Sequence, residues 1–326
     1  MIKFDNVSKR YPSGNIAVNS LSLNIKEGEF FVIIGPSGCG KTTTLKMINR
    51  LIDLSDGTIY IKDKKISEYD IHELRWNIGY VLQQIALFPH MTVEENISIV
   101  PELKKWDKGR IKDRITELLE SVGLEPERYR HRKPAELSGG EQQRVGVVRA
   151  LAADPSIILM DEPFSALDPI TRQKLQQDIL KLQKSIKKTI VFVTHDMQEA
   201  LALGDRICVM KDGVTVQCDT PNEIVNNPKN DFVKNFFQFA NVYKTSLLNT
   251  GYKVRNLFEI DLYQHYKAED GISSIDDTAS IEDLLKKLTN EKAVPVERKG
   301  EIIGTVTPEH VVKFISLQLE KGGEIL

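Results

Sequence analysis

The sequence predicts an α/β fold with a mainly parallel sheet flanked by helices, and two observations carry this prediction. Short, mainly apolar runs, typical of strands that are buried on both faces, recur at 30–34, 157–160 and 189–194. A glycine-rich turn at 35–40 joins the first of these runs to a segment, 42–51, with the apolar spacing of a helix. Strand and helix patterns that alternate in this way are typical of a parallel sheet with helical crossovers.

The turn after the first strand has the spacing G-x-x-x-x-G-K-T of a phosphate-binding loop. Its glycines allow successive backbone N–H groups to point at phosphate, and the following helix N-terminus adds partial positive charge. Lys41 supplies a cation for the β- and γ-phosphates, and the Thr42 hydroxyl can ligate Mg²⁺. A glycine-rich turn before an ordinary helix is the alternative, which the ordered strand, loop and helix disfavour. The expected nucleotide-binding residues are Gly35, Pro36, Ser37, Gly38, Cys39, Gly40, Lys41, Thr42 and Thr43.

A second glycine-rich segment, Leu137–Arg144, reads Leu-Ser-Gly-Gly-Glu-Gln-Gln-Arg. Ser138 and Glu141 fit a capping box at the start of a helix, but capping does not explain the two glycines between them. Glycines there leave the backbone N–H groups bare, so that a phosphate can reach them. The octapeptide is the signature of the ATP-binding-cassette family, which the chain resembles over about residues 1–237. The resemblance implies a P-loop NTPase core with an antiparallel β-subdomain and a helical subdomain.

Two adjacent carboxylates, Asp161 and Glu162, follow the apolar run 157–160. A carboxylate at the end of such a strand, near the phosphate loop, suits Mg²⁺ coordination through water. Glu162 is then placed to polarise the attacking water, as a general base or an orienting group. A solvated turn is the alternative for adjacent acids in isolation. The family resemblance implies that His195, just past the strand 189–194, senses the γ-phosphate and takes part in catalysis.

Further site residues follow from the resemblance alone. Gln83 matches the family's glutamine that contacts Mg²⁺ and the attacking water; Gln84 is the neighbouring alternative, which the family's spacing disfavours. Tyr11 matches the aromatic residue that stacks on adenine, and a surface tyrosine near a turn is its alternative reading. The loop that crosses the family's dimer interface corresponds to Ser165, Ala166, Leu167 and Asp168.

The signature segment approaches a γ-phosphate from the side opposite the phosphate loop, so one subunit cannot supply both to the same nucleotide. The resemblance therefore implies a homodimer with two shared sites, ATP and Mg²⁺ as ligands, and ATP hydrolysis as the reaction. The residues expected to bind the partner's ATP are Ser138, Gly139, Gly140 and Glu141.

The composition is that of an ordinary soluble protein, with 41% hydrophobic and 28% charged residues among 326. The net charge of −2 implies no basic face for nucleic acid. No apolar run approaches the roughly 20 residues of a membrane span, and the N-terminus has no signal-peptide pattern. Three cysteines indicate a reducing cytosol rather than a disulfide framework. One of them, Cys39, lies inside the phosphate loop. Its two readings are a small residue that fits the loop and a reactive thiol, because a helix N-terminus lowers thiol pKa.

The chain divides by pattern into a nucleotide-binding domain, 1–237, and a C-terminal region, 238–326. Residues 2–34 alternate strand patterns with turns, as in an antiparallel β-subdomain. Residues of about 88–152 are strand-poor and form the expected helical subdomain, in which Ile111–Val122 is amphipathic.

Residues of about 272–317 predict a small α+β unit of order βαββα. Its last helix opens at Pro308, with Val311, Val312 and Ile315 apolar. The unit resembles a single complete CBS motif. Where that family often has a ribose-binding aspartate this chain has His310, so a dimerisation or packing module stands beside a ligand sensor as an alternative.

A cassette ATPase without membrane spans needs an integral permease to transport a solute, and an importer also uses an extracellular or membrane-tethered solute-binding protein. The soluble relatives differ, since translation factors carry two cassettes and repair ATPases carry coiled-coil or zinc insertions. The segment 83–97 resembles that of bacterial importer ATPases. The segments 70–76 and 99–106 resemble those of osmoprotectant importers for glycine betaine, carnitine, choline or proline. Import of polar amino acids and export, for example of bile salts, remain alternatives. The expected location is the cytoplasmic face of the cell membrane.

Overall fold

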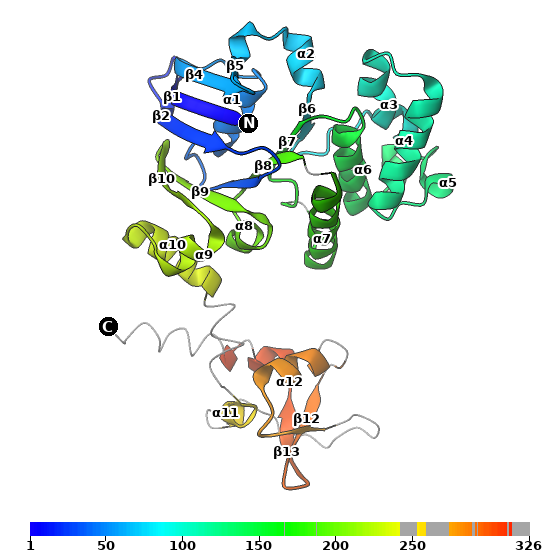
Figure 1. The fold of residues 1–326 in the computed structure, drawn as a ribbon. Coiled ribbons are helices and arrows are strands. Elements are labelled where there is room, and N and C mark those ends of the chain that lie inside the picture. The colour runs from blue at the N-terminus through cyan, green and yellow to red at the C-terminus, as the bar shows by residue number, and fades with distance from the viewer. Residues whose placement is uncertain are drawn as a thin grey trace. The chain divides into compact units, whose positions relative to one another are not determined.

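The computed structural model divides into two compact units, Met1–Phe237 and Gln238–Leu326 (Figure 1). It describes residues 1–165, 167–186, 188–241, 253–258, 274–288, 291, 293–311 and 313–314. Within these ranges no helix has both the length and the apolar character needed to cross a lipid bilayer.

The first unit is organised around a six-stranded sheet in the order β10-β9-β3-β8-β7-β6. All neighbours pair in parallel except the edge strand β10, which is antiparallel to β9. The strands are β3 (Phe30–Ile34), β6 (Ile78–Val81), β7 (Ile157–Asp161), β8 (Thr189–Thr194), β9 (Arg206–Lys211) and β10 (Val214–Asp219). Because parallel strands end at the same edge, the loops after β3, β6, β7 and β8 converge there.

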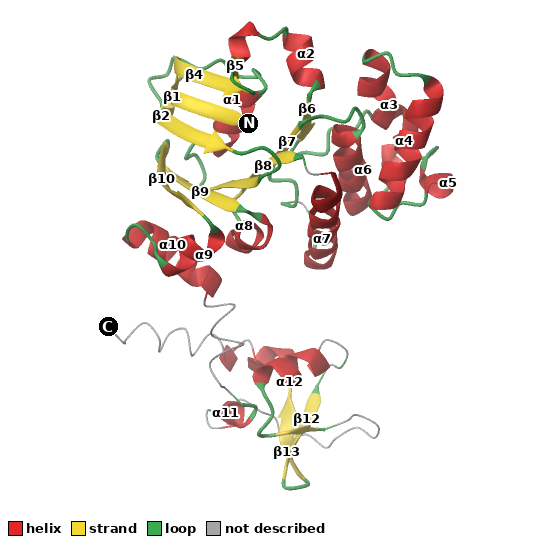
Figure 2. Ribbon diagram, viewed as in Figure 1, coloured by secondary structure: helices red, strands yellow, loops and turns green. Residues whose placement is uncertain are grey.

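A four-stranded antiparallel sheet packs against this core, in the order β2-β1-β4-β5 (Figure 2). Its strands are β1 (Ile2–Arg10), β2 (Ile16–Ile25), β4 (Asp56–Ile61) and β5 (Lys64–Lys65). The expectation that residues 2–34 form the antiparallel subdomain is therefore wrong at its end, since β3 belongs to the parallel sheet. All five residues of β3 are buried, as a central strand requires, whereas buried and exposed residues are interspersed along β1 and β2.

Residues 93–151 form the helical part of this unit. Its helices are α3 (Val93–Leu103), α4 (Lys108–Ser121), α5 (Pro126–Tyr129), the short 3₁₀ turn η2 (Pro134–Glu136) and α6 (Gly139–Leu151). The predicted apolar face of α4 is confirmed, because Ile111, Ile115, Leu118 and Leu119 are all buried. Arg144 on α6 donates to the carbonyl of Val122, just after α4, and to Asp178 Oδ2 at 2.7 Å. These contacts link α6 to the end of α4 and to Asp178, which lies in 169–186.

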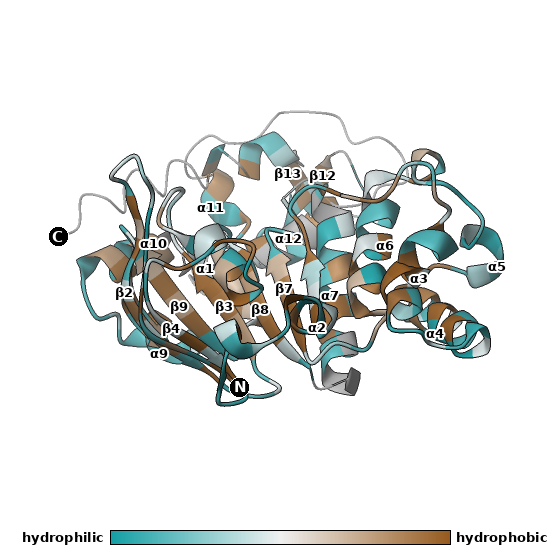
Figure 3. Ribbon diagram, turned by 90° about the horizontal axis from the view of Figure 1, so that it is seen from above, coloured by the Kyte–Doolittle hydropathy of each residue, from teal (hydrophilic) through white to brown (hydrophobic). Residues whose placement is uncertain are grey.

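The parallel sheet is apolar on both faces, as the brown strands of Figure 3 show. Phe30, Val32 and Ile34 of β3 join one buried cluster with the helices, while Phe31 and Ile33 join a second cluster with α1 and the antiparallel sheet. The remaining helices are α1 (Lys41–Ile48), η1 (Ile66–Glu68), α2 (Ile71–Trp76), α7 (Pro169–Ile186), α8 (Met197–Leu203), α9 (Pro221–Asn226) and α10 (Asp231–Asn241). Helix α1 stops before the predicted residue 51, because Arg50 takes a left-handed φ of 53°.

The second unit contains a three-stranded sheet, β11-β12-β13, in which β11 is parallel and β13 antiparallel to β12. Its elements are α11 (Arg255–Phe258), β11 (Ile275–Asp276), α12 (Ile281–Leu288), β12 (Val294–Arg298) and β13 (Glu301–Val306). This order matches the predicted strand–helix–strand–strand series, and helical residues begin again at Pro308. Val312 and Ile315, of the predicted last helix, lie outside the described residues.

Candidate active site

The parallel register places the ends of β3, β7 and β8 side by side. Ile34 lies opposite Thr194, and Asp161 lies opposite Val193. The phosphate loop, Glu162 and His195 each follow one of these paired residues in sequence. The sheet therefore gathers segments from three distant parts of the sequence at one edge.

The phosphate loop depends on glycine at positions where the backbone passes close to other main-chain atoms. Gly40 has a left-handed φ of 100°, and a Cβ there would lie 2.2 Å from the Ala17 carbonyl oxygen of β2. A Cβ on Gly35 would lie 2.1 Å from the carbonyl oxygen of Met210 on β9. Both contacts are shorter than any side chain tolerates, so the loop can take this path only with glycine at these positions.

Lys41 is buried, and its ammonium group turns back into the loop. Nζ donates to the carbonyl oxygens of Gly35 at 2.8 Å and Pro36 at 3.0 Å. Because both acceptors are neutral, the positive charge of Lys41 stays available to an anion. The loop and the N-terminus of α1 thus form a site suited to phosphate.

The structure brings Thr42 and Asp161 together, although they are far apart in sequence. Thr42 Oγ1 donates to Asp161 Oδ1 at 2.8 Å, and the Tyr80 hydroxyl lies 3.4 Å from Asp161 Oδ2. Burial is the main cause that raises the pKa of Asp161. A nearby cation would offset this desolvation, and the hydroxyl and carboxylate oxygens are ligands that Mg²⁺ prefers. These residues fit a Mg²⁺ ion that takes its other ligands from phosphate and water.

Glu162 is held in an unusual backbone conformation beside His195 and Gln83. Its φ is 44°, in the left-handed region, and its N–H donates to the Val193 carbonyl at 2.9 Å. Glu162 Oε2 lies 2.8 Å from His195 Nδ1 and 3.5 Å from Gln83 Nε2. A residue with this strain persists only where surrounding contacts hold it, and such residues concentrate at functional sites. The carboxylate is positioned to take a proton from a water molecule.

The signature segment makes a separate set of contacts. Ser138 caps α6 in a complete capping box, with its N–H donating to Glu141 Oε2 at 2.8 Å and its Oγ accepting from the Glu141 N–H at 3.3 Å. Glu141 Oε1 accepts from the Tyr129 hydroxyl at 2.6 Å, and this bond lowers the pKa of Glu141. Ser138 and Gly139 are exposed to solvent. These partners lie within 129–141, whereas Lys41 and Thr42 bond to the phosphate loop and Asp161.

The remaining predicted residues are Tyr11 and the interface loop 165–168. Tyr11 is half-buried at the turn after β1, with Lys9 Nζ 5.3 Å from its ring centre. Ser165 Oγ donates to the Glu162 carbonyl at 3.0 Å, which links the predicted interface loop to the carboxylate. Leu167 is buried, and Ala166 lies outside the described residues. Asp168 Oδ1 accepts from the Thr171 N–H at 3.1 Å and caps α7.

Of the two readings of Cys39, the structure favours the small residue that fits the loop over the reactive thiol. Its side chain is 3% exposed, and burial raises the pKa of the thiol more than the neighbouring Lys41 lowers it. Desolvation penalises the thiolate, and here it outweighs the charge and dipole at the start of α1. Cys39 acts as a small residue that fits between the phosphate loop and the core.

Sequence reasoning missed a polar network behind His195. Glu199 of α8 is 5% exposed and accepts from the Thr194 hydroxyl at 2.6 Å. Arg172 of α7 lies 3.5 Å from Asp196 Oδ2 and donates to the Leu167 carbonyl at 3.2 Å. These residues line a small cavity together with Glu162 and His195. No short motif marks them, because their contacts depend on how α7 packs against α8.

Glu199 predicts a pH dependence of folding stability. Burial is the main cause that raises its pKa from 4.5 to about 7. The folded state therefore holds this proton over a range in which the unfolded state has released it, so stability should fall as pH rises between these two values. Relative to Glu199→Gln, we expect the free energy of unfolding of the wild type to fall by up to about 3 kcal/mol across this pH range. Urea unfolding of both proteins at each end of the range measures this difference, and parallel pH profiles would contradict it.

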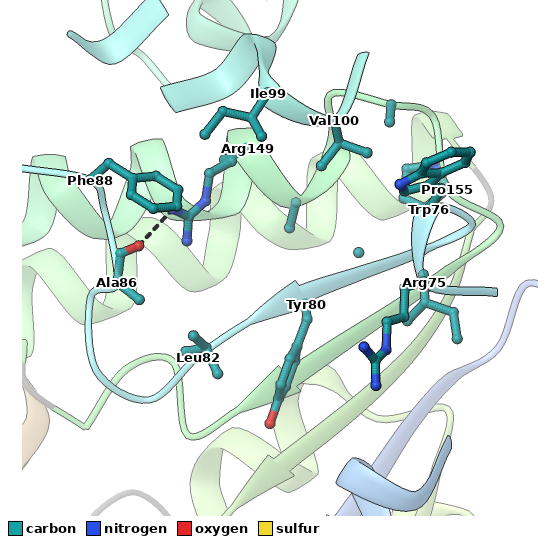
Figure 4. A pocket seen from close by; sticks show the side chains of 14 residues that line it. Arg75, Trp76, Tyr80, Leu82, Ala86, Phe88, Ile99, Val100, Arg149 and Pro155 are labelled. Atoms are coloured by element: carbon teal, nitrogen blue, oxygen red, sulfur yellow. Dashed lines mark hydrogen bonds between the residues drawn. The ribbon is translucent and has the colours of Figure 1, made fainter. Parts of the chain in front are cut away.

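An apolar groove lies between α2, α3, α6 and the loop after β6 (Figure 4). Its volume is about 400 Å³, and its lining includes Trp76, Phe88, Ile99 and Val100. Arg149 donates to the Ala86 carbonyl at 2.7 Å within it, as the dashed line in Figure 4 shows. Phe88 is 51% exposed, so the groove presents an aromatic ring to solvent.

The phosphate loop on a parallel sheet defines a P-loop nucleotide-binding protein, and the comparisons narrow this class. The family model described as ABC transporter matches residues 18–165. The glycine betaine uptake system ATP-binding protein YehX of Escherichia coli is 51% identical over 73% of this chain and 76% of its own length. The dimeric ABC transporter cassette MJ0796 is 41% identical, with a TM-score of 0.62 over 68% of this chain and 99% of that one. The chain therefore belongs to the ABC transporter ATP-binding family.

Other relatives are longer than the matched region. The glycine betaine/carnitine/choline transport ATP-binding protein OpuCA of Bacillus subtilis is 60% identical over 72% of this chain. The chain spans 62% of that relative, and 59% of the carnitine transport ATP-binding protein OpuCA of Listeria monocytogenes. The chain thus spans less than two thirds of the length of each of these two relatives.

Proposed function

We propose that this chain is the ATP-hydrolysing subunit of a membrane transporter that imports quaternary ammonium osmoprotectants. Glycine betaine, carnitine and choline are the proposed solutes, because relatives 58–60% identical carry those names. A relative that is 43% identical is named for import of Fe(3+) ions. Relatives that are 46% and 51% identical are named for betaine or osmoprotectant transport. The protein works at the cytoplasmic face of the membrane.

The observation that carries the catalytic proposal is the position of Glu162 between His195 and Gln83. Glu162 accepts a proton from, or orients, the water that attacks the γ-phosphate, and His195 holds its carboxylate at 2.8 Å. Lys41 and the loop 35–43 bind the phosphates, and Tyr11 stacks on adenine. Mg²⁺, held by Thr42 and, through water, by Asp161 and Gln83, would neutralise charge on the phosphates.

The active form is a homodimer with two shared sites. Residues 138–141 of each copy bind the γ-phosphate held by its partner, and the loop 165–168 crosses between the copies. Ser138 and Gly139 are exposed, as a surface for an external phosphate must be. The dimeric cassette MJ0796 supports this assembly by likeness.

Shared sites make a distinctive prediction for mixed dimers. Neither Lys41→Ala nor Ser138→Arg homodimers retain an intact site, so each should hydrolyse ATP poorly. A dimer of one chain of each combines the intact loop of one with the intact signature of the other. ATP hydrolysis by the mixture should therefore exceed the sum of the separate preparations. A mixture no more active than that sum would contradict shared sites.

The apolar groove supports the docking of a permease. A short amphipathic helix from a cytoplasmic loop can bury its apolar face against Phe88, Ile99 and Val100. The groove is bounded by the loop that contains Gln83, so docking and the nucleotide site share one segment. ATP closes the dimer, hydrolysis opens it, and the permease alternates its access.

Reconstitution with the co-encoded permease and solute-binding protein tests the transport proposal. ATP-dependent uptake of labelled glycine betaine, carnitine or choline into vesicles is the expected result. Uptake of polar amino acids instead, or ATP-driven export, would replace the solute or the direction. Stimulation of ATP hydrolysis by nucleic acid or ribosomes, without permease, would support a soluble factor instead.

The second unit is proposed to be a regulatory CBS-like module, with residues 1–237 as the catalytic domain. Thr307 precedes the helical residues that begin at Pro308, and its N–H donates to His310 Nδ1 at 3.2 Å, so this ring faces its own turn. The ribose-binding aspartate of such motifs is thus replaced by a local contact. This favours packing, dimerisation or sensing of ionic strength over binding of an adenosine nucleotide.

Removal of the second unit tests this regulatory role. A chain ending at residue 237 should hydrolyse ATP within about twofold of the full chain, because the described site lies entirely in the first unit. Transport in vesicles should lose its dependence on ionic strength. Persistence of that dependence after truncation would place the sensor elsewhere.

A further inference from the structure

Two cysteine thiols face each other at the edge of the six-stranded sheet. Cys208 of β9 and Cys218 of β10 are direct partners in the antiparallel register. Such partners have Cα atoms about 4.5–5.5 Å apart and side chains on one face, and a disulfide needs about 4.4–6.8 Å. We infer that Cys208 and Cys218 are a redox modification site, which forms a reversible disulfide when a hydroperoxide reaches Cys218.

Cys218 has the surroundings of a reactive thiol. The Arg206 guanidinium donates to Cys218 Sγ at 3.2 Å, and Arg206 is itself held by Glu29 Oε1 at 3.2 Å and the Asn24 carbonyl at 3.1 Å. The hydrogen bond from Cys208, together with the Arg206 charge, lowers the pKa of Cys218 despite its partial burial. Cys218 is half-buried on an edge strand, so a small oxidant can reach it.

Cys208 has the complementary role. It is fully buried, and its Sγ lies 3.5 Å from Thr215 Oγ1. Its hydrogen bond to Cys218 and its burial raise the pKa of this thiol. Cys208 therefore meets no oxidant directly, but it is adjacent to the sulfur of Cys218 after that sulfur has reacted.

The chemistry takes two steps. The Cys218 thiolate attacks a hydroperoxide oxygen, so that an S–O bond forms, the O–O bond breaks and an alcohol or water leaves with a proton. The Cys208 sulfur then attacks the sulfur of the Cys218 sulfenic acid, the S–S bond forms, and water leaves with the thiol proton. Two thiols lose two electrons and the hydroperoxide gains them. A dithiol reductant reverses the change.

The site adjoins the phosphate loop. Cys208 lies two residues before Met210 in strand β9, and the carbonyl oxygen of Met210 lies against Gly35 of the phosphate loop. Cys39 belongs to the same buried cluster as Cys208, but it sits in α1's loop rather than opposite another cysteine. Cys39 thus serves as an internal control of similar burial.

The test treats the reduced full-length protein with hydrogen peroxide, alkylates the remaining thiols under denaturing conditions and maps peptides by mass spectrometry. We expect a Cys208–Cys218 linkage that lacks two hydrogens and disappears with dithiothreitol. Cys218 should be consumed at least about tenfold faster than Cys39. Cys208→Ser should leave a sulfenic acid on Cys218 that dimedone traps, and Cys218→Ser should leave Cys208 as the thiol.

Cys39→Ser is the matched control and should leave the linkage unchanged. A linkage that involves Cys39, or no linkage in the wild type and in Cys39→Ser, would overturn the inference. Oxidation of Cys208 in Cys218→Ser at the wild-type rate would also overturn it. If Cys208→Ser or Cys218→Ser fails to fold, the wild type and Cys39→Ser still decide the outcome.

Discussion

Glu162→Gln should bind MgATP with nearly wild-type affinity yet hydrolyse it at least about 100-fold more slowly. The amide keeps the shape of the side chain and its reach to His195, but it cannot accept a proton from water. In the proposed cycle hydrolysis reopens the dimer, so the variant should accumulate as an ATP-bound dimer. Phosphate release measures turnover, and light scattering with and without MgATP measures the dimer.

Glu120→Gln, on the exposed surface of α4, is the matched control and should behave as wild type. A Glu162→Gln protein with wild-type turnover would show that another group handles the proton. His195→Ala should be less severe if His195 only holds the carboxylate, since Glu162 would keep its strained backbone position.

Lys41→Ala should weaken MgATP binding by about 100-fold, because it removes a buried charge from the phosphates. The carbonyls of Gly35 and Pro36 that now accept from Lys41 would also lose their donor. Isothermal titration with MgATP and MgADP separates this effect from one on hydrolysis. The loss should be larger for MgATP, which carries the additional γ-phosphate.

Lys112→Ala, exposed on α4, controls for the general loss of one positive charge. Equal weakening in both variants would mean that the effect is long-range electrostatics. Unchanged MgATP affinity in Lys41→Ala alone would remove this residue from the proposed phosphate site.

The parts of the site that follow strand ends could be predicted from sequence. Asp161 is the last residue of one apolar strand, and Lys41 and His195 follow two others; parallel strands bring such places together whatever the details of packing. The Thr42–Asp161 bond is a direct consequence. The same reasoning found the buried face of α4, because a periodicity of 3.6 residues is visible within a single segment.

The rest depends on neighbours that are distant in sequence. Arg172 and Glu199 line one cavity with His195 only because α7 and α8 pack together, and neither residue belongs to a short motif. The sequence left two readings of Cys39 open, because local charge and dipole are visible in sequence whereas the surrounding core that desolvates the thiol is not. The end of the antiparallel sheet was misplaced for a related reason, since the partner of a strand is chosen by the whole fold.

The capping of Ser138 has a consequence for how a closed dimer reopens. In the free chain its hydroxyl donates to Glu141 Oε2 at 2.9 Å, so it already has a partner. Donation to a partner subunit's nucleotide would therefore replace an existing hydrogen bond and would not satisfy an unpaired donor. An exchange of one acceptor for another yields little net energy, so this contact adds selectivity without making the closed state hard to leave. If this helix end binds ATP as proposed, it can also release the product, because its own glutamate takes the hydroxyl back.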